Sequence, residues 1–156
     1  MQPIGTIRSP FSSLKDMPIQ PKGAKGTIGT IEVKKEYMEG LNDLDGFSHI
    51  YLLYTFHKAA RTDLTVTPFM DTTPRGVFST RSPLRPNHIG ISIVELVSVE
   101  KNLITVRGID ILDGTPLLDI KPYIESFDAV QNSRSGWMKG SVDDVEKKRS
   151  DDRFID

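Results

Sequence analysis

The stretch IGISIVELVSVEKNLITVRGI, residues 89–109, decides the fold. It contains two runs rich in Ile, Val and Thr, 91–99 and 103–109, and these residue types favour β-strands. Residues 100–102 (EKN) separate the two runs at the spacing of a tight hairpin. The two strands are therefore expected to pair antiparallel.

The first of these strands carries a change of pattern. Apolar residues alternate along positions 89–93, and Val94, Leu96 and Val97 then break the alternation. Such a break indicates either a β-bulge or a strand that is buried on both faces. Both features are common in β-barrels.

Strands dominate the rest of the chain. Segments rich in Ile, Val, Thr, Tyr and Phe occur at 4–7, 27–33, 49–56, 64–68, 77–81, 90–99, 103–109 and 117–121. One short helix is expected at 35–44, where Tyr37, Met38, Leu41 and Leu44 recur at three- and four-residue spacing before Asp45-Gly46 stops it.

These elements predict a mainly β protein: a single-domain closed antiparallel or mixed β-barrel with one or two short helices. Residues 1–140 would form the barrel domain, and 141–156 a charged C-terminal tail or helix. Within that tail, 142–149 fits either a docked terminal helix or a frayed end.

The amino-acid composition limits the kinds of chemical site that the protein can contain. The 156 residues include 20 Lys and Arg, 21 Asp and Glu, and no Cys. The absence of Cys excludes disulfides, thiolate metal sites and Cys nucleophiles, and the three His residues lie in separate segments, so no metal site is expected. We find neither a secretory signal nor an apolar run near the roughly 20 residues that span a bilayer, and we expect a cytoplasmic protein.

The charge is unevenly distributed. Residues 1–35 hold six basic and two acidic side chains, and residues 57–90 hold five basic and two acidic ones. If the two basic segments fold onto one face, they would form a local patch for phosphates, because salt screens charges over about 8–10 Å. The alternative is ordinary solvated surface.

Two stretches have the composition of site loops. The stretch GVFSTRSPLRPNHIGIS, residues 76–92, holds arginines in a loop that two prolines stiffen. The stretch DILDGTPLLDIKPY, residues 110–123, contains a tight turn next to a carboxylate. A stiffened barrel corner and a simple turn are the alternatives.

Both stretches closely resemble signatures of the TsaA-like family, which includes the TrmO-type tRNA methyltransferases. The resemblance extends through PIQP at 18–21, DGFSHI at 45–50 and FHK at 56–58, and covers about residues 1–128. It implies a β-barrel that uses S-adenosylmethionine, in homodimers whose sites lie near the subunit interface. The family's known reaction is N6-methylation of threonylcarbamoyladenosine beside the anticodon of tRNA.

The resemblance also implies which residues contact the cofactor. These are Pro18, Ile19, Gln20, His57, Lys58, Arg81, Ile91, Leu112, Asp113, Gly114 and Thr115. The family more often has Arg where Ile19 stands, which leaves backbone contacts there, and Pro or Ala where His88 stands.

Proton transfer and RNA contacts have their own candidates. Asp113 and His57 could accept the proton of the acceptor nitrogen, although Asp113 could instead cap its turn and His57 could be a core histidine. Arg85, Lys58 and Arg75 are the candidates for contacts with RNA phosphates, since their cationic groups suit anions. A methyltransferase acting on another RNA or on a small molecule, and a non-catalytic barrel that binds cofactor or RNA, remain the alternatives.

Overall fold

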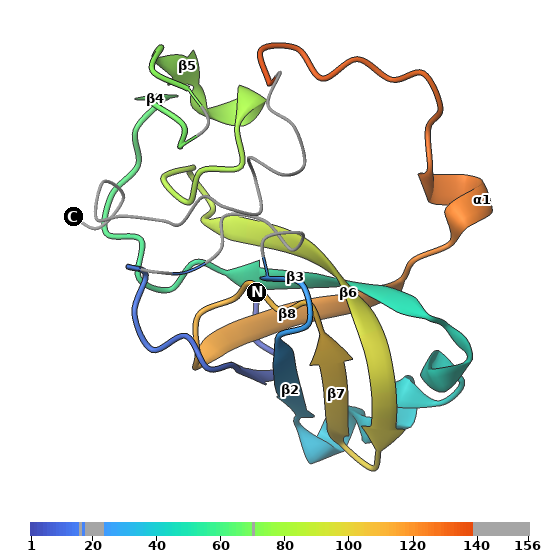
Figure 1. Cartoon of the computed structure of the whole chain (residues 1–156). Coiled ribbons are helices and arrows are strands. Elements are labelled where there is room, and N and C mark those ends of the chain that lie inside the picture. Colours follow the sequence, from blue (N-terminus) through green and yellow to red (C-terminus); the bar gives the residue numbers. More distant parts are fainter. Residues whose placement is uncertain (16, 18–23, 70, 139–156) are drawn as a thin grey trace.

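Six strands close into a barrel in a computed structural model that describes residues 1–15, 17, 24–69 and 71–138 (Figure 1). Their order around the barrel is β1-β2-β7-β6-β3-β8, and every neighbouring pair is antiparallel. The predicted mainly β fold with a closed barrel is thus confirmed, and the pairing is antiparallel rather than mixed. The strands are β1 Gly5–Arg8, β2 Ile28–Val33, β3 His49–Thr55, β6 Ile89–Glu100, β7 Leu103–Arg107 and β8 Thr115–Pro122.

The hairpin between β6 and β7 forms as expected. Glu100 pairs with Leu103, and Lys101 in the turn has a positive φ of 56°. The register shifts between Leu96 and Ser98, which confirms the predicted bulge in β6. The bulge residue Val97 is exposed, so the break in alternation reflects an extra residue.

The barrel interior is filled by alternating side chains from all six strands. Branched aliphatic residues dominate, as expected for strands with one face turned inward. The members with no exposed surface are Ile7, Ile31, Ile50, Leu52, Ile104, Val106, Ile109 and Leu117. This core holds together the strands whose ends carry the loops described below.

The helix expected at 35–44 is two short 3₁₀ turns instead. They are η2, Lys35–Leu41, and η3, Leu44–Gly46. Between them Asp43 adopts a left-handed φ of 69°, which an α-helix cannot accommodate. A single α-helical turn, α1 Glu125–Asp128, was not predicted, and the segment 142–149 lies outside the described residues with the rest of the 141–156 tail.

A small module lies beyond one end of the barrel, at the top of Figure 1. It contains β4 Thr65–Val66, β5 Arg75–Gly76 and the 3₁₀ turn η4 Val77–Ser79. Its own apolar cluster consists of Val66, Val77 and Leu84 with Phe69 against them. We call residues 64–85 the side module.

The strand expected at 77–81 was wrong, and that expected at 64–68 shortens to β4. The Ser79 Oγ donates to the Gly76 carbonyl and the Thr80 Oγ1 to the Val77 carbonyl, each at 2.7 Å. Such bonds to carbonyls three residues back favour a turn over an extended strand. In the described part of the chain, no helix has the length and apolar character needed to cross a membrane.

Candidate functional site

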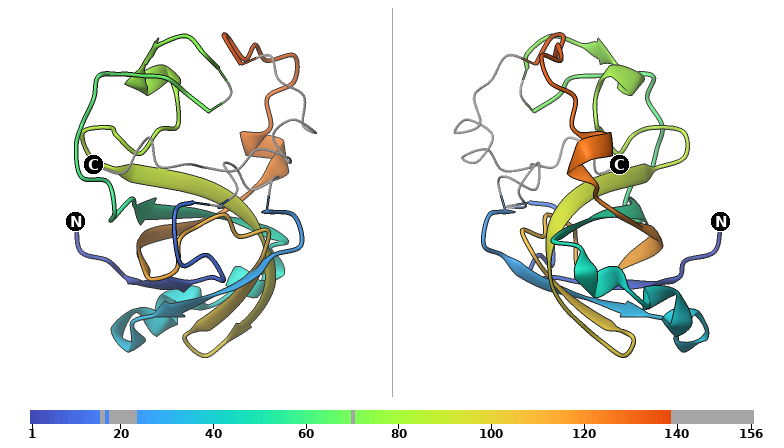
Figure 2. Two further views of the ribbon diagram at one scale, coloured as in Figure 1. Left: turned by 60° about the vertical axis from the view of Figure 1, so that its left-hand side comes forward. Right: turned by 90° about the vertical axis from the view of Figure 1, so that its right-hand side faces the viewer.

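The segments singled out in the sequence meet at one end of the barrel. Strand pairing sets this, because Ile7 near the end of β1 pairs with Thr115 at the start of β8, and Thr55 at the end of β3 pairs with Ile89 at the start of β6. The residues that follow β3 and those that precede β6 and β8 therefore emerge together. Figure 2 shows the segment between β3 and β6, in green, above the barrel, while the β6–β7 hairpin lies at the opposite end.

The turn at residues 112–115 is fastened to the N-terminal segment. The Gly114 N–H donates to the Ile7 carbonyl and the Asp113 N–H to the Phe11 carbonyl, both at 2.8 Å. Thr115 closes the turn through its Oγ1, which donates to the Leu112 carbonyl at 2.6 Å. Gly114 has a φ of 82°, a conformation that glycine adopts without strain.

Asp113 itself is exposed at the tip of this turn. Its Oδ1 accepts a hydrogen bond from the Ser9 N–H at 3.1 Å. This contact joins the turn to the residue that follows β1, whereas the capping considered in the sequence would use a backbone N–H of the turn itself. The second carboxylate oxygen, Oδ2, takes no part in that bond.

A buried polar chain that was not predicted from the sequence ends at Asp110, two residues before the turn. The Tyr54 hydroxyl lies 3.0 Å from the Ser92 Oγ, and that Oγ donates to the Asp110 Oδ1 at 2.7 Å. Burial raises the pKa of Asp110 to about 7, opposed by the Ser92 hydrogen bond and the positive charge of Arg81. Burial together with Asp110 also raises the pKa of Tyr54. The sequence feature that could have indicated this chain is a single carboxylate, Asp110, between two isoleucines, Ile109 and Ile111.

Gly90 lets two aromatic rings approach the start of β6. A Cβ at this position would lie 2.4 Å from the Tyr54 Cε2 and 2.8 Å from the Phe56 Cζ. The two rings meet edge to face, with centroids 5.5 Å apart. Gly90 therefore leaves the space that the Tyr54 ring occupies at the end of the buried polar chain.

The described residues assigned to the cofactor lie at this same end. His57 and Lys58 are exposed just after β3, Ile91 is 44% exposed on β6, and Arg81 is exposed with its charge acting on Asp110. Partial burial and then the Lys58 charge lower the pKa of His57, which favours its neutral form. Pro18, Ile19 and Gln20 lie outside the described residues.

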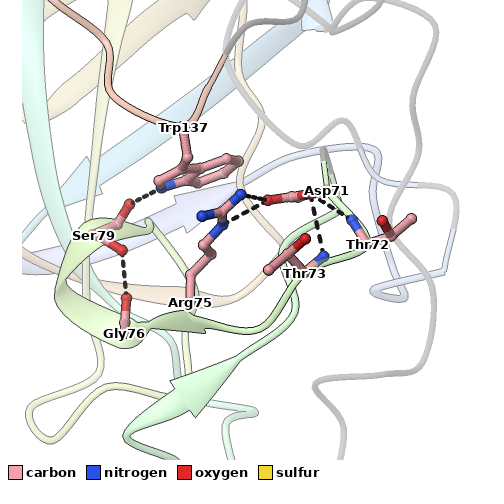
Figure 3. A network of polar contacts seen from close by, with 7 residues as sticks. All are labelled: Asp71, Thr72, Thr73, Arg75, Gly76, Ser79 and Trp137. Carbon is pink, nitrogen blue, oxygen red and sulfur yellow. Dashed lines mark hydrogen bonds and ion pairs between the residues drawn. The ribbon is translucent and has the colours of Figure 1, made fainter.

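Two of the RNA-contact candidates are held within the side module. The Arg85 Nη1 donates to the Thr80 and Ser82 carbonyls, at 2.9 and 3.3 Å. The Arg75 Nη2 lies 2.6 Å from the Asp71 Oδ2 (Figure 3). Over residues 1–15, 17, 24–69 and 71–138, no group of three or more Asp, Glu or His side chains is placed to hold a metal ion.

A family model described as the tRNA-methyltransferase O N-terminal domain (TrmO_N) matches residues 6–129. The chain belongs to this TrmO family. The match includes the residues at the site end of the barrel from β1 through β8, and it confirms the family resemblance seen in the motifs.

Individual relatives agree with this membership. A probable S-adenosyl-L-methionine-binding protein of Pyrococcus abyssi is 53% identical over 99% of this chain and 84% of its own length. The human tRNA (adenine(37)-N6)-methyltransferase is 38% identical over 84% of this chain, which spans 31% of that protein. A crystal structure of TrmO from Pseudomonas aeruginosa, 41% identical, superposes with a TM-score of 0.73 over 87% of this chain and 60% of that one.

Proposed function

We propose that this protein is an S-adenosylmethionine-dependent methyltransferase acting on tRNA, with N6 of threonylcarbamoyladenosine beside the anticodon as the acceptor. Membership of the TrmO family carries the proposal. It is supported by relatives named as S-adenosyl-L-methionine-binding proteins and as tRNA (adenine(37)-N6)-methyltransferases.

The side chains at the site end fit the cofactor by their chemistry. S-adenosylmethionine has a carboxylate, an ammonium group, ribose hydroxyls and a flat purine. Lys58 and Arg81 suit the carboxylate, Asp113 suits the ammonium or the hydroxyls, and the exposed Ile91 offers an apolar surface to the purine. When bound, S-adenosylmethionine supplies a methyl group on a positively charged sulfur.

The protein's main task is then to orient the acceptor and to take up its proton. The fastened turn at 112–115 is suited to orientation, because its backbone is bonded to Ile7 and Phe11. Of the two candidate bases we favour His57, since its lowered pKa keeps the imidazole neutral and able to accept a proton. Asp113 is already engaged with Ser9 and acts mainly on the turn.

We further propose that the protein works as a cytoplasmic homodimer with its sites near the subunit interface. The outward face of β6 supports this, because Ile91, Ile93 and Val97 are 44%, 38% and 44% exposed. Ile91 belongs both to this apolar face and to the assigned cofactor contacts. Sedimentation of the parent chain and of Ile93→Lys tests the assembly, and a parent chain that is monomeric at assay concentration would contradict it.

Transfer of labelled methyl groups to tRNA tests the function. The substrate is bulk tRNA from a strain that lacks its own such enzyme, and the labelled nucleosides are then analysed by mass. Methylated threonylcarbamoyladenosine is the expected product. Label on a different nucleoside would identify a different methyl acceptor. Cofactor binding without label on any RNA would indicate a non-catalytic binding protein.

A further inference from the structure

Two arginine–aromatic pairs flank the turn η4 in the side module. The Arg85 guanidinium lies over the Phe78 ring, 5.9 Å from its centroid. The Arg75 guanidinium lies over the Trp137 ring, 5.6 Å from its centroid. Cation–π pairs of this kind are stabilising, and each holds a flat guanidinium against the face of an aromatic ring.

Trp137 reaches this module from the far end of the described chain. Its Nε1 donates to the Ser79 carbonyl at 2.7 Å, across 58 positions of sequence (Figure 3). Arg75 is fixed from its other side by Asp71, whose Oδ1 also accepts from the Thr72 and Thr73 N–H groups at 2.7 and 3.2 Å. Both members of the Arg75–Trp137 pair are therefore held in place before any ligand arrives.

Phe78 is positioned but not buried. It is 72% exposed, although its neighbour Val77 is 1% exposed in the module's apolar cluster. Arg85 is anchored by its bonds to the Thr80 and Ser82 carbonyls, so the cation beside Phe78 is also preorganised. An exposed aromatic ring held beside a fixed cation is the arrangement on which unstacked nucleic-acid bases pack.

Charge complementarity indicates the same ligand. Residues 57–90 hold five basic side chains and two acidic ones, a net charge of +3, and both acidic residues are paired with arginines, Asp63 with Arg61 and Asp71 with Arg75. An anionic strand is therefore attracted to the surface that carries the two rings.

We propose that Phe78 with Arg85, together with Trp137 and Arg75, forms a stacking surface for unpaired bases of the RNA substrate. This inference rests on the proposed function, and the ligand is a single-stranded loop of tRNA. Bases in a continuous duplex are stacked on one another and are not available to such a surface.

Trp137 supplies a direct probe, because it is the chain's one Trp. Its fluorescence is measured on the full chain during titration with bulk tRNA and, in parallel, with a fully paired RNA duplex. Saturable quenching by tRNA but not by the duplex is expected. Equal quenching by both, or none at a tRNA concentration that saturates binding in a filter assay, would overturn the stacking surface.

Substitutions at Phe78 separate stacking from simple apolar contact. Phe78→Leu should weaken tRNA binding about tenfold, equivalent to about 1.4 kcal/mol, and Phe78→Tyr should restore it. Phe127→Leu is the matched control, since Phe127 is 79% exposed in α1. Parental affinity in Phe78→Leu, or equal weakening in Phe127→Leu, would refute the proposal. A change in sedimenting mass with unchanged RNA affinity would assign the surface to a second copy instead.

The same variants distinguish failure of this surface from failure of the reaction. If Phe78→Leu transfers methyl groups with the parental KM for tRNA, the stacking surface is rejected and the proposed reaction is retained. If tRNA binding depends on Phe78 but no tRNA is methylated, the proposed reaction is rejected and the stacking surface is retained.

Discussion

Replacing Asp110 by Asn should make the protein more stable at alkaline pH and should flatten the dependence of its stability on pH. Asp110 is 8% exposed, and burial raises its pKa from 3.8 to about 7. The folded protein therefore favours the protonated carboxyl. This contribution to stability is complete below the unfolded pKa and is lost as pH rises from about 4 to about 7.

The size of the effect follows from the shift. About three pKa units at 1.36 kcal/mol each correspond to about 4 kcal/mol of unfolding free energy lost by the parent above pH 7. Asn cannot ionise, and its Oδ1 can still accept the bond from Ser92. The difference between Asp110→Asn and the parent should be small at about pH 4 and should approach this value at about pH 8.

Urea unfolding followed by circular dichroism across this pH range measures the difference. Asp45→Asn, at an exposed position in η3, controls for the loss of one carboxylate. A difference between Asp110→Asn and the parent that is the same at both ends of the range would show that Asp110 does not titrate there. It would refute the reasoning from burial.

Three other substitutions test neighbouring parts of the site. Gly90→Ala places a Cβ 2.4 Å from the Tyr54 ring and should lower stability by about 1–3 kcal/mol in thermal unfolding, whereas Gly40→Ala, with nothing within 4 Å, should not. His57→Gln should lower kcat at least about 100-fold and should remove the acidic limb of the kcat–pH profile. In the parent this limb should lie below pH 6.5, because the pKa of His57 is lowered. An unchanged profile would exclude His57 as the base. Asp113→Asn should keep the Ser9 contact and most single-turnover methyl transfer, and a loss of more than about 100-fold would return Asp113 to the role of base.

The barrel could be predicted because its signals are local. Alternating branched residues in β6 and β7, and the short separation between the two runs, predict the hairpin, and the break in alternation predicts the bulge. The segment 77–81 also contains residues that favour strands, Val77, Phe78 and Thr80. There the Ser79 and Thr80 hydroxyls bond to nearby carbonyls, and this competition is not visible in composition.

The interior of the site could not be predicted in the same way. Asp110 and Ser92 lie 18 positions apart, and Trp137 and Ser79 lie 58 apart, so each contact depends on the closed barrel or on the path of the chain around it. The family motifs did mark 56–58, 76–92 and 110–123 as site segments. The motifs indicated which segments belong to the site, and the strand pairing shows that these segments meet at one end of the barrel.

The bulge at Val97 also bears on how this protein's length can change in evolution. Two residues of β6 oppose one of β7 there, so removing one residue restores a regular ladder and leaves the facing of Gly90 and Ser92 unaltered. Elsewhere in β6, losing one residue would exchange the inward and outward side chains beyond that point. We therefore expect natural insertions and deletions within this strand, where homologues have them, to be concentrated at Val97.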